Sequence, residues 1–261
     1  MALTKVSRGL VNTSIEDNGN ATAITIDSSE NVGIGITNPS DYYAENLVVG
    51  AADEGGITIE SGATEKTYLM FAQGTSGQSA YRGFIGYDHN TSLEIMNVAS
   101  SGVLNFITGS SQIERMRIDA SGRVTMPSQP TFNAYRNVNN YVFTSEGTFL
   151  CNATRHNVGN HFSTSTGRFT APVAGVYHFT FHTIYYSTIS NGSVQLFKNG
   201  SGLAGTHTHF SSNQSSVWNH VVIATTVSLN ANDYIEPYNS SGSAVTLHGG
   251  TWNHFAGYLL G

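Results

Sequence analysis

The sequence has little charge, one cysteine and no long hydrophobic run. Charged residues make up 11% of the 261 residues, and Cys151 is the single cysteine. An internal disulfide and a multi-cysteine metal site are therefore excluded. No apolar stretch approaches the length of a membrane-spanning helix, and the polar residues that follow Met1 are not typical of a secretory signal peptide. The 11 lysines and arginines do not cluster, which argues against a nucleic acid partner.

Glycine and aromatic residues are abundant by comparison. The chain has 28 glycines, and aromatic residues make up 11% of the sequence. Disordered polar chains are usually poor in aromatic residues, so this composition indicates packed structure. Short windows such as residues 23–27 and 83–87 alternate apolar and polar side chains between turn-forming residues, and no window of useful length has a helical period. We therefore predict an all-β fold.

Charge, aromatic content and histidine content all change near residue 133. Residues 1–133 carry 7 basic and 14 acidic side chains, whereas residues 134–261 carry 4 and 3. Nine of the ten histidines lie in the second part. Two prolines within four residues indicate extended chain at the same place. We predict a domain boundary there, with a linker at 128–131 and a C-terminal domain at 132–261.

The strands predicted before the linker are short, and their apolar residues come as isolated pairs such as Leu93 and Ile95. Such strands cannot bury a core alone. Three identical chains wound about one axis would share an interior, and an ordinary monomeric β domain is the alternative. The stretches 26–34 and 118–126 also align at an offset of 92 residues, and each reads as strand, polar turn and strand. This internal repeat suggests one building block used twice.

The first half of the chain resembles bacteriophage tail fibres. Residues 31–40, with the sequence NVGIGITNPS, are similar to an NVGIGT-x-x-P motif that recurs in fibres of marine tailed phages and in trimeric bacterial adhesins. Ile36 departs from the motif, because threonine is more usual there. The resemblance implies a virion-attachment segment at 1–40, which would bind a phage tail or baseplate protein, and a β-rich trimeric shaft at 41–127.

The last third resembles the C1q/tumour-necrosis-factor-like jelly roll, a β-sandwich that works as a trimer. The resemblance rests on residues 167–179, 194–200 and 255–260 and covers roughly 132–261. It implies a homotrimeric head whose exposed loops recognise a ligand. Alternation along the strands indicates which side chains face the interior. The residues predicted to form the core or the trimer seam are Tyr177, Phe179, Phe181, Phe255, Gly257 and Tyr258.

His207 and His209 are the candidate metal ligands. Residues i and i+2 of a strand project from one face. Around a threefold axis, one such pair per chain would present six imidazoles, which suits octahedral iron, nickel or cobalt better than tetrahedral zinc. A polar loop is the alternative, because Ser, Asn and Gly surround the pair. A metal ion at the threefold axis is the only cofactor considered.

An enzymatic active site is not predicted. Cleavage of a polysaccharide needs two cooperating carboxylates, and the C-terminal domain contains only Glu146, Asp233 and Glu236. The last two are three residues apart on a predicted strand and would point to opposite faces. Cys151 and His156 are close in sequence, but such proximity is mostly coincidence.

A recognition surface is predicted instead. Exposed aromatic rings beside Asn, Ser and His suit stacking on sugars or docking on surface proteins. Tyr185 and Trp218 are expected at the trimer seam, whereas Trp252, in a glycine-rich loop, is expected to be exposed. The residues predicted to bind a receptor are Trp252, His248, His254 and Tyr238.

Together the two resemblances imply a homotrimeric bacteriophage tail fibre that adheres to the host cell through its head. Its partners would be further copies of itself, a tail or baseplate protein, and a host surface polysaccharide or protein, with no nucleic acid and no membrane insertion. It would reside in the virion after synthesis in the host cytoplasm. A polysaccharide depolymerase tailspike and a secreted C1q-like binding protein are the alternatives.

Overall fold

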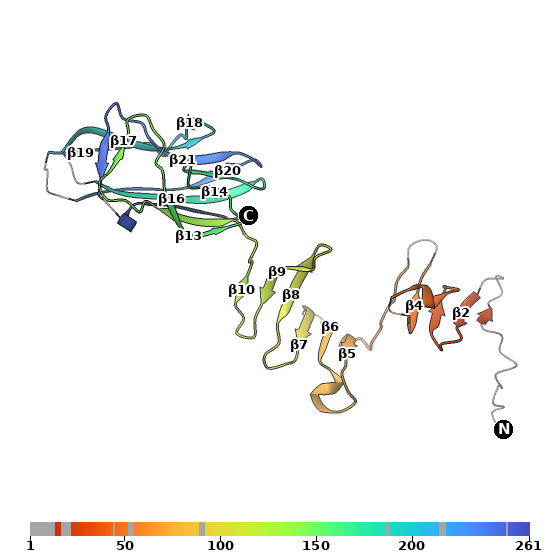
Figure 1. The fold of residues 1–261 in the computed structure, drawn as a ribbon. Coiled ribbons are helices and arrows are strands. Elements are labelled where there is room, and N and C mark those ends of the chain that lie inside the picture. The colour runs from red at the N-terminus through yellow and green to blue at the C-terminus, as the bar shows by residue number, and fades with distance from the viewer. Residues whose placement is uncertain are drawn as a thin grey trace, which may run out of the picture. The chain divides into compact units, whose positions relative to one another are not determined.

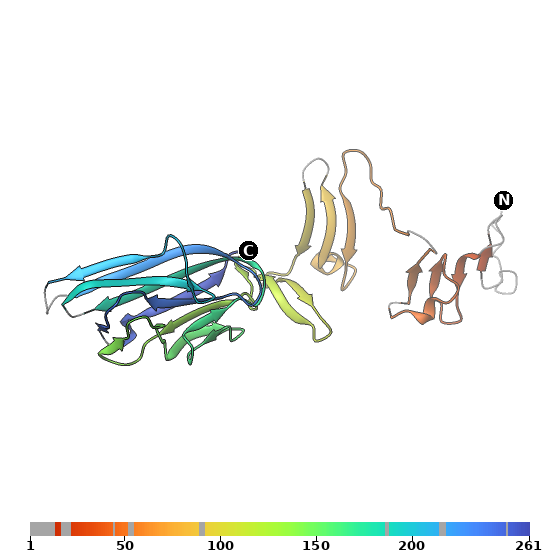
Figure 2. The same ribbon diagram turned by 90° about the horizontal axis from the view of Figure 1, so that it is seen from above.

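The part of the chain that the computed structural model describes contains 23 β-strands and three short 3-10 helices. The all-β prediction is therefore confirmed. No helix among these residues is long and apolar enough to span a membrane. The chain divides into two compact units, Met1–Gly102 and Val103–Gly261 (Figure 1, Figure 2). The described residues are 14–16, 22–43, 45–51, 55–88, 92–185, 188–213, 218–248 and 250–261.

The described part of the first unit contains two small sheets. Its elements are β1 (Ser14–Glu16), β2 (Thr22–Ile26), β3 (Val32–Ile34), η1 (Pro39–Asp41), β4 (Leu47–Val49), β5 (Thr67–Phe71), η2 (Gly77–Ala80), β6 (Gly83–Asp88) and β7 (Ser92–Asn97). In one sheet, β2 pairs antiparallel with both β1 and β3, and β4 joins β3 in parallel. In the other, β5, β6 and β7 form an antiparallel meander.

Two glycines of the NVGIG stretch are required by the first sheet. Gly35 has a φ of 68°, and a Cβ atom there would come within 2.2 Å of the Gly50 carbonyl oxygen. A Cβ atom at Gly33 would come within 2.5 Å of the Ile36 carbonyl oxygen. The segments are held this closely because Gly50 N donates a hydrogen bond to Ile34 O at 3.0 Å. The motif is therefore a packing requirement of this sheet.

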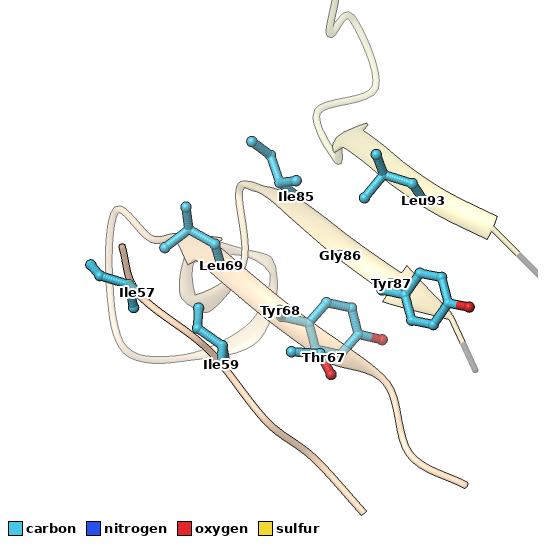
Figure 3. A pocket seen from close by; sticks show the side chains of 9 residues that line it. All are labelled: Ile57, Ile59, Thr67, Tyr68, Leu69, Ile85, Gly86, Tyr87 and Leu93. Atoms are coloured by element: carbon cyan, nitrogen blue, oxygen red, sulfur yellow. The ribbon is translucent and has the colours of Figure 1, made fainter. Parts of the chain in front are cut away.

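The sheet of β5, β6 and β7 leaves one apolar face exposed. Leu69, Ile85 and Ile95 are paired across the three strands and so share a face, and their side chains are 42–54% exposed. A shallow pocket on this sheet is also lined by Ile57 and Ile59 of the preceding segment (Figure 3). We name as the shaft face the five exposed residues Leu69, Ile85, Tyr87, Leu93 and Ile95.

The second unit begins with another small meander. Its strands are β8 (Leu104–Thr108), β9 (Ile113–Ile118) and β10 (Val124–Thr125). They pair in the order β10-β9-β8, all antiparallel. Every sheet before the head is therefore built from short strands of two to six residues.

Residues 131–261 form a sandwich of two sheets, called the head below (Figure 2). The first sheet contains β11 (Thr131–Tyr135), β12 (Tyr141–Phe143), β13 (Ala153–Val158), β16 (Gly175–Tyr185), β20 (Asn219–Leu229), β22 (Val245–Leu247) and β23 (His254–Leu259). The second contains β14 (Phe162–Ser163), β15 (Arg168–Thr170), β17 (Ile189–Lys198), β18 (Ser201–Gly202), β19 (Thr208–Ser212) and β21 (Tyr234–Asn239). Strand β16 organises the first sheet, because it pairs with β20 along its whole length and with β23 on its other side.

An aromatic core lies between the two sheets. Tyr177, Phe179 and Phe181 on β16 are fully buried, as the alternation of the sequence predicted. Phe132 of the first sheet stacks on Phe169 of the second, with ring centroids 5.0 Å apart and planes 13° from parallel. Each such side chain contributes about 1.5–3 kcal/mol when it is fully buried. The core of the protein is therefore concentrated in the head.

The last strand, β23, contributes one face to this core. Phe255 is fully buried. Gly257 lies against Phe179, since a Cβ atom at Gly257 would come within 2.5 Å of the Phe179 ring. Tyr258 points the other way and is 44% exposed. The predictions of Phe255 and Gly257 as interior residues agree with this arrangement, whereas Tyr258 lies on the outer face of the first sheet.

Candidate recognition site

Three aromatic rings meet at one end of the first sheet. Trp218 directly precedes β20, His248 directly follows β22, and Trp252 ends η3 (Gly250–Trp252). The ring centroids of Trp218 and His248 are 4.3 Å apart, and those of Trp218 and Trp252 are 4.7 Å apart. Trp218 is 42% exposed and Trp252 is 45% exposed. We call these three residues the aromatic cluster.

The aromatic cluster lies at the end of the head opposite to the linker. The register pairs Tyr185, at the end of β16, with Asn219 and Leu247, which adjoin the cluster in sequence. At the start of β16, Val176 N donates to the C-terminal Gly261 O, and Leu259 N on the neighbouring strand donates to Pro130 O. Eleven residues at ~3.3 Å per residue separate the two ends of β16 by roughly 33 Å.

A buried asparagine anchors the loop that carries His248 and Trp252. Asn253 is fully buried. Its Oδ1 accepts hydrogen bonds from Thr183 Oγ1 and from Ile184 N, both at 2.8 Å, and its Nδ2 donates to His248 O. His248 N donates in turn to Ile184 O at 2.7 Å. The loop is therefore tied to β16 at His248 and at Asn253 by hydrogen bonds that are screened from water.

Three histidines from adjacent strands lie beside the cluster on the outer face of the first sheet. His182 Nδ1 must carry the proton, because it lies 2.9 Å from the Trp252 carbonyl oxygen, which can only accept. His182 Nε2 lies 3.3 Å from His220 Nδ1, and the rings of His182 and His254 are 5.2 Å apart. We call His182, His220 and His254 the histidine row.

The charge around the histidine row is positive or neutral. Burial lowers the pKa of His254, and His182 and Arg155 lower it further. The guanidinium of Arg155 lies over the Tyr135 ring at 4.7 Å and donates to Thr251 O at 3.2 Å. A cationic side chain therefore lies next to the loop that carries the aromatic cluster.

The three carboxylates of the head lie elsewhere. Lys198 and then Asn199 hold the pKa of Asp233 at about 2, and Lys198 Nζ lies 2.9 Å from its carboxylate. Glu236 is almost fully buried on β21 and forms an ion pair with Arg168 at 2.9 Å. Glu146 lies beside that same strand, because its carbonyl accepts the hydroxyl of Tyr238. The Asp233 and Glu236 carboxylates are therefore associated with the second sheet, and the backbone of Glu146 lies beside it.

The four residues predicted to bind a receptor do not form one site. The structure brings Trp252, His248 and His254 to the same end of the first sheet, together with Trp218. Tyr238 is on the second sheet, where its ring stacks on Phe197 with centroids 4.0 Å apart. Sequence reasoning did not pair the two tryptophans, because they meet through strand pairing between distant segments.

Tyr185 is not at an exposed seam. Its side chain is 3% exposed, and its ring packs on Phe210 with centroids 4.7 Å apart. The expectation of a seam position is corrected here, because the alternation along β16 turns Tyr185 toward the core with Tyr177, Phe179 and Phe181.

The candidate metal ligands His207 and His209 do lie side by side. Their ring centroids are 4.3 Å apart, and His207 Nε2 makes a 3.0 Å hydrogen bond with Ser240 Oγ. Within the described residues, no group of three or more His, Cys, Asp or Glu side chains is placed to hold a metal ion. A single protomer thus offers two imidazoles here, and the metal site at a threefold axis stays a prediction.

The thiol of Cys151 is not suited to nucleophilic chemistry. It is fully buried, and burial raises its pKa to about 12. The thiolate is the reactive form, so a buried thiol with this pKa is inert near neutral pH. His156 makes its hydrogen bond with Thr131 Oγ1 at 3.2 Å.

Comparison with known proteins concerns the head. The C1q domain family matches residues 131–260. The complement C1q tumor necrosis factor-related protein 3 of Mus musculus is 34% identical over 107 residues, which are 40% of this chain and 41% of that protein. Protein 9B of the same group, from Homo sapiens, is 35% identical over 68 residues, 26% of this chain and 20% of that one. The chain therefore spans less than half the length of these curated relatives.

Two solved structures align with the same half of the chain. The globular domain of zebrafish complement 1qA protein covers 51% of this chain and 98% of its own, at 23% identity and a TM-score of 0.42. Eiger TNF from S. frugiperda covers 51% and 94%, at 15% identity and a TM-score of 0.41. The family match and the sheet arrangement confirm the predicted jelly roll, while the resemblance to tail fibres stays a prediction. Residues 131–260 of this chain match the C1q domain family.

Proposed function

We propose that the protein is the homotrimeric subunit of a bacteriophage tail fibre, which adheres to the host cell surface through its C1q domain. The observation that carries the proposal is the exposed apolar surface of the small sheets that precede the head. The resemblance of the first half to fibre proteins supports the phage origin and a virion-attachment role for residues 1–40. The domain's similarity to C1q and tumour necrosis factor proteins supports three copies.

Aliphatic side chains of three strands share one face of the first sheet. In its register, Ile26 pairs with Val32 and Val32 with Leu47, so the three share a face. Ile34 and Val49 pair on the same face two residues further along. Leu47 is 58% exposed and Ile26 is 47% exposed. A protein that acts alone rarely exposes contiguous apolar faces of this kind.

The other two small sheets repeat this arrangement. The shaft face of β5, β6 and β7 is 42–69% exposed, and the ion pair of Lys66 with Asp88 at 2.7 Å is formed beside it. In the meander of β8, β9 and β10, Phe106 is 46% exposed and Val124 is 56% exposed. Identical chains would bring matching faces together in register, since each copy carries the same series of sheets. Covering such side chains yields about 25 cal/mol per Å² of apolar surface.

We propose further that the protein acts by binding and not by catalysis. Hydrolysis of a glycosidic bond requires two carboxyl groups that are free to act as acid and base or nucleophile. Of the three carboxylates in the head, Asp233 and Glu236 are engaged in ion pairs with Lys198 and Arg168. This pairing favours adhesion over a depolymerase tailspike.

A secreted C1q-like binding protein is the second candidate. The observation that favours it is that the curated relatives of the head are animal C1q-related proteins. Both candidates assign recognition to the head. They differ in the surface that is recognised and in the role of the segments before residue 128.

Light scattering of the full chain, followed by adhesion to cells, tests the proposal. The expected mass is about 84 kDa, three times the 27.9 kDa of one chain. A mass of 27.9 kDa in dilute solution would contradict it. The labelled protein should bind a subset of intact bacteria, whereas binding to animal cells alone would favour the second candidate. New reducing ends released from bacterial polysaccharide would favour the depolymerase.

A further inference from the structure

We propose that the aromatic cluster of Trp218, His248 and Trp252 is a binding platform for a saccharide, with a pyranose ring stacked on the exposed indoles. The inference rests on the proposed function, because it names the ligand class that the head would recognise. Its first support is exposure. Both indoles are more than 40% exposed in a head whose other large aromatic side chains are mostly buried.

The second support is that the platform is already formed. Three hydrogen bonds tie the loop to β16 through Asn253 and His248, and a fourth joins Asn253 to His248 within the loop. His182 Nδ1 donates a hydrogen bond to Trp252 O at 2.9 Å, and Arg155 donates one to Thr251 O at 3.2 Å. A ligand would therefore find the loop of His248 and Trp252 held at several points beforehand, which reduces the ordering that binding requires. Pre-organisation of this kind lowers the entropic cost of association.

The third support is the match of chemistry. Indole and imidazole rings combine apolar faces with polar N–H edges. A pyranose has the complementary form, with a face of C–H groups surrounded by hydroxyls. Polar groups are available at the rim, since Asn139 Oδ1 lies beside Gly250, 3.7 Å from where a Cβ atom would be. Ligand sites commonly combine an apolar surface with a few polar groups of this kind.

The charges near the cluster disfavour a cationic ligand. Aromatic rings also bind quaternary ammonium groups. Here, however, Arg155 adjoins the loop, and the Asp233 and Glu236 carboxylates of the head lie with the second sheet. A cation would meet repulsion without a compensating carboxylate. A neutral or acidic sugar meets no such penalty.

The chain provides its own reporter for this site. Trp218 and Trp252 are the two tryptophans of the sequence, so intrinsic tryptophan fluorescence reports on the cluster alone. The full chain would be titrated with the methyl pyranosides of glucose, galactose, mannose, N-acetylglucosamine and glucuronic acid. Saturation-transfer NMR would be recorded on the same samples. We expect at least one of these sugars to change the fluorescence and to receive saturation on its ring C–H protons.

Substitutions locate the binding. Trp252→Ala should weaken the affinity by about tenfold or more, as for an aromatic residue at the centre of a contact. Trp252→Phe keeps an aromatic ring and should retain a larger part of the affinity. This variant also controls for a loss of binding that is caused by misfolding of Trp252→Ala. Tyr258→Ala is the matched control, because Tyr258 is a similarly exposed ring on the outer face of the same sheet. It should leave sugar binding unchanged.

The outcomes separate this inference from the proposed function. If cell adhesion requires Trp252 but none of the pyranosides binds, the saccharide assignment is wrong and adhesion stands. If Trp252→Ala lowers the mass of the assembly, the cluster is a contact between copies, and the inference is overturned. If a sugar binds a protein that does not adhere to bacteria, the site stands and the proposed function fails.

Discussion

At the scale of single residues, we expect His254 to make the head sensitive to acid. Burial lowers the pKa of His254 below its ordinary value of 6.5. As the pH falls, His254 is therefore protonated in the unfolded chain before it is protonated in the folded head. The free energy of unfolding decreases from about pH 6.5 downward, until His254 in the folded head is protonated as well. The groups that face His254 are His182, His220 beyond it, and Arg155 over Tyr135.

His254→Gln should reduce the loss of thermal stability between pH 7.5 and pH 5. The physical reason is that the variant has no imidazole at the position where burial lowers the pKa of His254. Thermal unfolding, followed by circular dichroism at both pH values, measures the change in unfolding temperature. His156→Gln serves as the control, because His156 is exposed on β13 and should leave the pH dependence as it is. An unchanged pH dependence in His254→Gln would refute the assignment.

A second residue-scale prediction concerns Gly257. A methyl group there would come within 2.5 Å of the Phe179 ring, which is fully buried. Gly257→Ala should therefore destabilise the head by about 1–3 kcal/mol, the usual cost of overpacking. Gly242→Ala is the matched control, since nothing lies within 4 Å of its added Cβ atom. The free energies of unfolding of the two variants, measured by urea denaturation, should differ by that amount. Equal denaturation midpoints would contradict the prediction.

Residues whose environment is set by local alternation could be predicted, and those set by distant pairing could not. Tyr177, Phe179 and Phe181 alternate on one strand, so their common burial follows from the sequence. The meeting of Trp218 and Trp252 depends instead on the arrangement of β20, β22 and β16. Nothing near Asn253 in the sequence indicates that its amide links two strands.

At the scale of elements, the internal repeat proves to be one turn built twice. Asp27 Oδ1 accepts hydrogen bonds from the backbone N of residues two and four positions later, at 2.8 and 3.0 Å. Asp119 Oδ1 does the same at 2.9 and 3.0 Å. The fourth residue of each turn has positive φ, 69° at Glu30 and 78° at Gly122. The repeat was predicted from sequence because an aspartate-initiated turn has a local signature.

The faces of the small sheets give a prediction at the same scale. Ile95 and Met96 are neighbours on β7, with exposures of 54% and 47%, but only Ile95 belongs to the shaft face. Ile95→Asp should disrupt or weaken the trimer, because it places a charge among apolar residues that the copies would cover. Met96→Asp, on the face that also carries Glu94, should disrupt it less. Sedimentation velocity across a concentration series would compare the fraction of trimer that the two variants form. Equal fractions would argue against a role for the shaft face.

At the scale of the whole molecule, the two halves of the chain differ in what makes them stable. The head has its own aromatic core. In the described part of the first unit, Val48 is the one hydrophobic residue that is buried. The sequence predicted this contrast from strand length and glycine content. It could not predict the number of copies or the surface they recognise, because both depend on contacts between chains.

The burial of Cys151 has a practical consequence. A thiol with a pKa of about 12 and no exposure does not react with maleimides near neutral pH, and the sequence has no other cysteine. A cysteine introduced at Thr226, which is exposed on β20, would then accept one fluorophore per chain without altering the native thiol. Single particles labelled in this way would bleach in discrete steps, and the number of steps would count the chains in each particle directly.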